Sequence, residues 1–307
     1  MIKKQRGVTL IELMISLVLS LALIGGISSL FQQMQTTNKS QLALSNIMDD
    51  SRYALEIMQK EIRYAGGLRS RSSITGTGAL VFAPLTAAKQ GVFAQLGYNT
   101  TPLPAGPAGI FGFIAGEYVQ GNLTSPRPAS DSFMIRYQLM DQNDLNPNNP
   151  SNSSSPCTSN SLLTLPADDP ATQVHVVTVY FYVNSGVLSC TSQRVRVDDV
   201  NTGATTCMTN CALGDAPAQL ISNVNRLVVT YGVDTGTDRS ANFYADALNV
   251  PNWLNVVSMR VSLVLQSADD DIVRVKAPYM VDRISFTPSD NRLYRVFSTT
   301  IALRNQI

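Results

Sequence analysis

Side chains that could do chemistry are few in this chain of 307 residues. There is one histidine, His175, and no serine or cysteine nucleophile motif, paired metal ligands or phosphate-cradling glycine loop accompanies it. A strand residue that is exposed or hydrogen-bonded is a better interpretation of His175 than a catalytic base. The sequence therefore predicts no active site, no metal site and no cofactor, and we expect a protein that is not an enzyme.

Four cysteines, Cys157, Cys190, Cys207 and Cys211, all lie in the second half of the chain. An even number, in a chain with few charges and many polar residues, is typical of an exported protein. Zinc is disfavoured because the CxxxC has no second close pair. We expect disulfides, with three pairings open. A disulfide between Cys207 and Cys211 would close a small loop. A disulfide between Cys157 and Cys190 would close a long loop and stabilise the folded protein by ~3–4 kcal/mol.

Residues 234–242 place acidic side chains at alternate positions, as a calcium-binding loop does. Gly236 stands where a second Asp or Asn is needed, and Arg239 stands where the turn needs glycine. The twelfth position is Ala245 instead of glutamate. A polar hairpin is therefore the favoured interpretation.

Charge argues against nucleic acid as a partner. The 23 basic and 22 acidic side chains leave a net charge of +1. No excess of Lys and Arg is available to displace phosphate counterions.

The N-terminus combines a basic segment, residues 1–7, with an almost wholly apolar one, residues 8–31, in which Glu12 is the single charge. The apolar run can cross a hydrocarbon core of ~30 Å. The basic flank predicts that the N-terminus stays in the cytoplasm, so that the chain crosses the membrane once. A secretory signal cleaved after Ala22 is the alternative. A costly glutamate within the run, and a helical pattern that continues beyond it, oppose that alternative.

A second segment, residues 32–65, continues the helix in amphipathic form. Its apolar stripe recurs at spacings of three and four, with most charges, Glu61 among them, on other positions. Together, residues 8–65 predict one rod of ~87 Å, with Gly25 and Gly26 the place to bend or loosen. Gly66 and Gly67 are expected to end it.

Residues 66–307 form the expected head domain. Loop-rich stretches cover residues 84–130 and 143–161. Alternating β-branched and aromatic residues predict strands at 132–139, 174–183, 186–192, 220–233, 256–266, 294–303 and part of 271–286. The fold class is therefore α+β, with a long N-terminal helix packed against a mainly antiparallel sheet.

The leader Lys3-Lys4-Gln5-Arg6-Gly7, followed by Val8-Thr9-Leu10-Ile11-Glu12-Leu13-Met14, resembles the start of type IV prepilins and the related pseudopilins. The resemblance implies that prepilin peptidase cuts after Gly7 and methylates the new amine on Val8. The family commonly has Phe at this position, so Val8 departs from the pattern.

Glu12 has a physical role independent of that resemblance. Cleavage creates a positive amine on Val8, and the Glu12 carboxylate can be neutralised by the amine of a neighbouring subunit. Such a pair would set the axial stagger between helices. An incidental carboxylate at the membrane edge is the alternative.

Three blocks, residues 228–235, 253–267 and 295–305, narrow the resemblance to minor pilins of the PilW type. It implies a subunit of the tip complex that primes type IV pilus assembly, with other minor pilins and the major pilin as partners. The chain would move from the inner membrane to the fibre tip at the cell surface. Two alternatives stay open: a type II secretion pseudopilin, and an adhesin whose loops bind a surface ligand.

Overall fold

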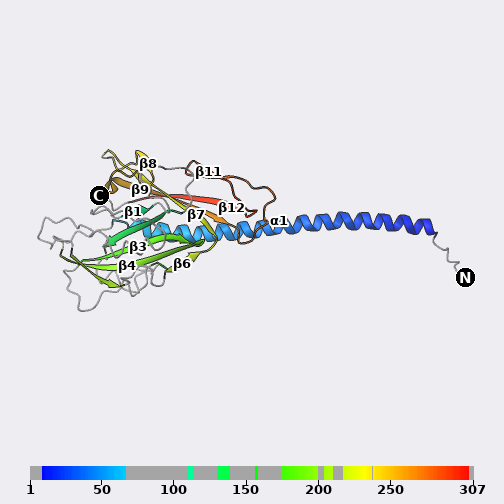
Figure 1. Ribbon diagram of the computed structural model, residues 1–307, viewed down its shortest axis with the longest axis horizontal. Helices are drawn as coiled ribbons and strands as arrows, with labels where there is room; N and C mark the ends of the chain where they lie inside the picture. Colours follow the sequence, from blue (N-terminus) through cyan, green and yellow to red (C-terminus); the bar gives the residue numbers. More distant parts are fainter. Residues whose placement is uncertain are drawn as a thin grey trace.

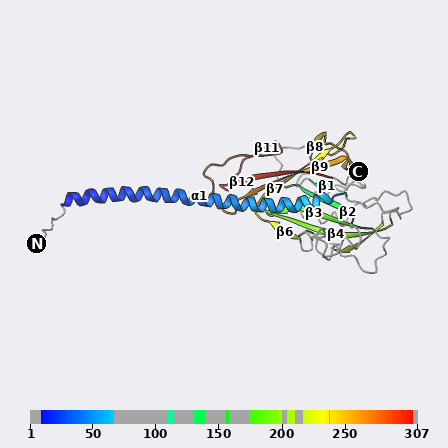
Figure 2. The ribbon, with the colours of Figure 1, turned by 180° about the vertical axis from the view of Figure 1, so that it is seen from behind.

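The computed structural model has the form of a long rod with a β-rich head at one end (Figure 1). It describes residues 9–66, 110–113, 130–138, 156–157, 174–199, 204–209, 217–236 and 238–303. The first described residue and the head lie at opposite ends of the rod, and the view from behind shows the same separation (Figure 2). The expected loop at 143–161 lies almost wholly outside the described residues.

The rod is a single helix, α1, Leu10–Tyr64, of 55 residues. At ~1.5 Å per residue its length is about 82 Å. The predicted continuous helix is therefore present. It also runs without interruption through Gly25 and Gly26, where we expected it to loosen. An added Cβ at either glycine would meet no other group within 4 Å, so no packing contact forces a break there.

Both ends of α1 follow from local chemistry. Thr9 is the N-cap with extended backbone, and its carbonyl oxygen accepts from the amides of Glu12 and Leu13 at 3.1 and 3.2 Å. At the other end Gly66 has φ +72°, the left-handed conformation that glycine adopts freely after a helix. Its amide donates to the carbonyl of Arg136 at 2.8 Å, which turns the chain from the helix onto a strand.

The described strands form two main sheets and one small hairpin, all antiparallel. The first sheet has the order β1-β2-β3-β4-β5, with β6 also pairing β4: β1 Ile110–Phe113, β2 Ser132–Gln138, β3 Val174–Asn184, β4 Val187–Asp199, β5 Ala204–Thr209 and β6 Ala218–Ile221. The second sheet has the order β12-β9-β7-β8: β7 Val224–Val233, β8 Phe243–Ala245, β9 Val256–Gln266 and β12 Tyr294–Ala302. The hairpin is β10 Tyr279–Val281 with β11 Ile284–Phe286, and a 3-10 turn, η2 Trp253–Asn255, precedes β9.

Two strand predictions need correction. The segment 220–233 was expected as one strand, but it divides at Ser222 and Asn223, and β6 and β7 belong to different sheets. Asn223 has φ +59°, a turn conformation that asparagine tolerates. Within the segment 84–130, expected as loop, residues 110–113 form β1 and pair with β2. Short strands of this kind are defined by their pairing partner and have too few residues to show a period.

One core joins α1 to both sheets. Figures 1 and 2 show α1 entering the head between the first sheet and the second. Its buried apolar face carries Ile47, Ala54, Met58 and Ile62. Fully burying each larger side chain of this kind contributes about 1.5–3 kcal/mol. The expected α+β class, a long helix packed against antiparallel sheet, is confirmed.

Candidate assembly interface

The N-terminal half of α1, residues 10–34, presents an exposed apolar surface. Its apolar side chains are half or more exposed, from Leu17 at 54% to Leu10 at 78%. The helix contains a window of mean hydropathy 2.4 of which no residue is buried, so it is long and apolar enough to cross a membrane. Such a surface is stable only against lipid or against other apolar side chains.

Glu12 lies on this surface in the first turn of α1, with its side chain exposed. The hydroxyl groups of the serines on this surface are hydrogen-bonded within the helix. Ser16, Ser20 and Ser29 each donate to a backbone carbonyl of the preceding turn at 2.7–2.9 Å. The Glu12 carboxylate has no such partner within the part of the chain that the structure describes. It is the one charged side chain of residues 9–34, so this stretch of the chain supplies no cation to neutralise it. Gly7 and Val8, the expected processing site, lie outside the described residues.

Polar contacts hold the other half of α1 in a defined orientation against the head. Gln59 Nε2 donates to Thr299 Oγ1 of β12 at 2.8 Å, and Ser40 Oγ donates to the carbonyl of Ile272 at 3.3 Å. These contacts are about 30 Å apart along the helix at ~1.5 Å per residue. The half of α1 inside the head is therefore held against it at two well-separated points.

Glu61 makes a buried contact, and the face of the helix predicted for it was wrong. We expected it on the polar face, but its side chain is 2% exposed and pairs with Tyr137 of β2. Burial, and next the negative charge of Glu61, raise the pKa of Tyr137 well above its usual value. The signal was present in the sequence, because Glu61 follows Ala54 by seven residues and Met58 by three, on the buried stripe.

The expected polar loop at 234–242 connects β7 to β8, which pair as a hairpin. The two carboxylate oxygens of Asp234 accept from the amides of Gly236 at 2.6 Å and Arg239 at 3.0 Å. The carboxylate is thus used within the loop, and Ala245 lies in β8. Over the described residues, no three His, Cys, Asp or Glu side chains come together as metal ligands. By backbone pairing His175 lies in β3 opposite Arg196.

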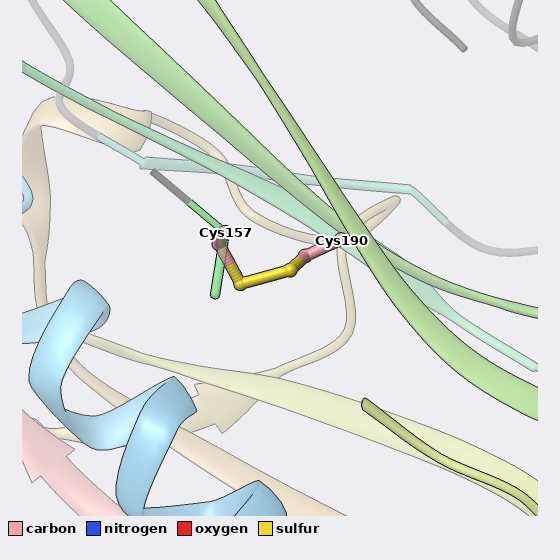
Figure 3. Close-up of a disulfide and its surroundings, with 2 residues drawn as sticks. All are labelled: Cys157 and Cys190. Carbon is pink, nitrogen blue, oxygen red and sulfur yellow. A yellow bond between two sulfur atoms is a disulfide. The ribbon is translucent and has the colours of Figure 1, made fainter. Parts of the chain in front are cut away.

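A disulfide joins Cys157 to Cys190, with the Cα atoms 5.4 Å apart (Figure 3). Both cysteines are buried in the core that contains α1 and the two sheets. The bond fastens a segment outside the strands to β4. Cys207 lies in β5, opposite Val195 by backbone pairing, and Cys211 lies outside the described residues.

A solved structure is similar to this chain, and two family models match parts of it. A type IV-like pilin from Thermus thermophilus is similar in structure, with 12% identity, 85% of this chain and 98% of that chain covered, and a TM-score of 0.39. No curated protein matches the chain. Residues 2–28 match the family model of the prokaryotic N-terminal methylation motif, and residues 190–305 match that of Type IV Pilus-assembly protein W. The second match contains β6 and the whole of the second sheet. The resemblance of this chain to pilus-assembly proteins of the PilW type, indicated by its leader and its C-terminal strands, is thereby confirmed.

Proposed function

We propose that this chain is a structural minor pilin of the tip complex that primes type IV pilus assembly. The observation that carries the proposal concerns the two halves of α1. One half is apolar and exposed, and the same helix continues into the head, where its other half is buried. One rigid subunit can therefore be held first by lipid and then by the helices of neighbouring pilins. The match to Type IV Pilus-assembly protein W supports pilus assembly as the setting.

The proposed organisation has four parts: a leader, residues 1–7; a membrane and assembly helix, residues 8–31; an amphipathic helix, residues 32–65; and a head, residues 66–307. Prepilin peptidase removes the leader after Gly7, and Val8 becomes the methylated N-terminus. The methylation-motif match supports this step. Other minor pilins and the major pilin are the partners.

N-terminal sequencing of the protein purified from its host tests the processing step. A methylated Val8 start is the expected result. A start at Leu23, or an intact Met1, would refute the prepilin assignment. Deletion then identifies the system: loss of surface pili and twitching supports the pilus role, whereas loss of exoprotein secretion with normal pili identifies a secretion pseudopilin.

The role of Glu12 is tested by Glu12→Leu, with Ser16→Leu as the matched control one turn along the same exposed face. Neither change makes the helix less apolar, so both variants should insert in the membrane and be cleaved after Gly7. Only Glu12→Leu removes a group that needs a cation from another subunit. Co-purification with other pilins from detergent extracts should be lost in Glu12→Leu and retained in Ser16→Leu. Normal co-purification of both would show that the helix packs by apolar contact alone.

A further inference from the structure

The outer edge of β12 is the longest regular strand edge among the described strands. β12 has nine residues, and its pairing with β9 shows no bulge. It contains no proline. The edge strands β8, β1 and β6 are short, with three, four and four residues, and β5 is irregular. The outer side of β7 beyond β8 is already used, because Ser130 and Asp131 bond to the backbone of Leu227 and Val229.

The direction of the β12 backbone groups follows from the bonds at its two ends. Ser267 donates to the carbonyl of Leu293, and Leu303 donates to the carbonyl of Val257. Leu293 and Leu303, which flank β12, are both odd-numbered. Because backbone groups alternate in direction along a strand, the odd residues of β12 bond to β9, and the even residues direct their amides and carbonyls outward. The outward carbonyl of Tyr294 accepts from the Arg295 side chain at 3.0 Å.

The outward groups that remain belong to Val296, Ser298, Thr300 and Ala302. The last three residues are exposed, and no backbone group of the described chain bonds to this edge. Natural proteins protect such edges with proline, bulges, inward charges or a covering element. Past the single cap at Arg295, none of these devices protects β12 among the described residues, and its valine, phenylalanine, threonines and isoleucine favour strand pairing.

We infer that the β12 edge binds an extended strand of a different pilin subunit by main-chain hydrogen bonding. Within the head, α1 keeps one side exposed at Arg52, Tyr53 and Glu56. The same part of the helix contacts β12, because Gln59 donates to Thr299. A subunit that packs along this part of α1 is therefore also close to β12. The inference rests on the proposed function for the class of partner.

A second copy of this chain is a poorer occupant. Two copies that pair through the same edge are related by a two-fold axis that sets the two strands antiparallel. β12 runs away from the free end of α1, so the strand and the helix point in the same direction along the molecule (Figures 1 and 2). A self-pair would therefore point the two α1 helices in opposite directions, although both must enter one membrane from the same side.

The test uses the full-length protein in its own piliated host. A benzoyl-phenylalanine crosslinker replaces Thr300, and the control site is Met280, which is 65% exposed on β10. Irradiation should join Thr300, more than Met280, to another processed pilin subunit, with the crosslink mapped by mass spectrometry to an extended segment. Crosslinks to a second copy of this chain, or none above the Met280 background, would overturn the inference.

A backbone variant separates main-chain docking from side-chain contact. Thr300→Pro removes an outward amide and leaves the bonds to β9, and Thr300→Ser keeps that amide. Yield of the crosslinked partner, measured from Ser298 as the crosslinker site, should fall at least about tenfold with proline and stay unchanged with serine. Thermal unfolding in detergent checks that the proline variant is folded, and a folded variant with full yield refutes the inference. If proline prevents folding, the Thr300 crosslink decides alone. A Thr300 crosslink to a pseudopilin, with normal pili after deletion, would refute the proposed function and leave this inference standing.

Discussion

Loss of the Cys157–Cys190 disulfide is expected to destabilise the head strongly. The two residues are separated by 33 positions. Closing a loop of this length removes chain entropy from the unfolded state worth about 3.7 kcal/mol at 25 °C. For a domain of this size that corresponds to a fall in Tm of about 7–15 °C. The effect is expected in the head alone, because the bond makes no contact with the exposed half of α1.

Two perturbations separate the crosslink from the packing of the sulfur atoms. Wild-type protein refolded under reductant keeps both sulfurs and loses only the bond, so its free energy of unfolding should fall by about 3.7 kcal/mol. The double variant Cys157→Ala/Cys190→Ala also loses buried contacts of side chains that are 4% and 0% exposed. It should therefore be less stable than the reduced protein, by about 1 kcal/mol for each methyl-sized void.

Denaturant unfolding of the full-length protein in detergent, followed by head tryptophan fluorescence and circular dichroism, measures all three forms. The chain's single tryptophan, Trp253, packs against Tyr231 with ring centroids 4.8 Å apart, so its emission reports the second sheet and core. A reduced protein within about 1 kcal/mol of the oxidised one would refute the loop-closure reasoning. It would mean that residual structure already restricts this segment in the unfolded ensemble.

Three further outcomes follow from the head. Gly232→Ala places a Cβ 2.1 Å from Ser258 Oγ and should cost about 1–3 kcal/mol in urea unfolding; part of this loss should return in Gly232→Ala/Ser258→Ala, and a neutral single variant would contradict the packing. Burial raises the pKa of Tyr180 above its usual 10.0. The contribution of Tyr180 to the free energy of unfolding is therefore fully present below pH 10 and falls above it, by up to ~1.4 kcal/mol per pH unit, because the unfolded chain ionises first. Tyr180→Phe should make this alkaline loss of stability less steep, and an unchanged slope would contradict the reasoning. Burial, and then the charge of Asp49, raise the pKa of Asp50, so the folded state gains stability as pH falls from neutral toward 3.8; Asp50→Asn should increase Tm at pH 7 and reduce the Tm difference between pH 7 and pH 4, and a lower Tm at pH 7 would count against it.

The rod could be predicted from the sequence with little loss. Helical structure depends on residues three and four positions apart, and the apolar spacing from residue 41 to residue 65 contains that information locally. The same holds for the end at Gly66, whose positive φ is a property of the residue type. Glu12 stood out for a similar reason, since a single charge in an apolar run needs no tertiary context to be recognised.

Pairing depended on the tertiary structure. Alternation predicted most strand segments, yet it did not show that Ser222 and Asn223 carry the chain from one sheet to the other, nor which of three pairings joins the cysteines. The burial of Glu61 beside Tyr137 was likewise not predicted. Nor was the open edge of β12, which exists because β9 pairs with only one side of the strand. A sequence pattern records which face of an element is apolar, whereas the partner of that face is selected by non-local contacts that form only when the whole chain is folded.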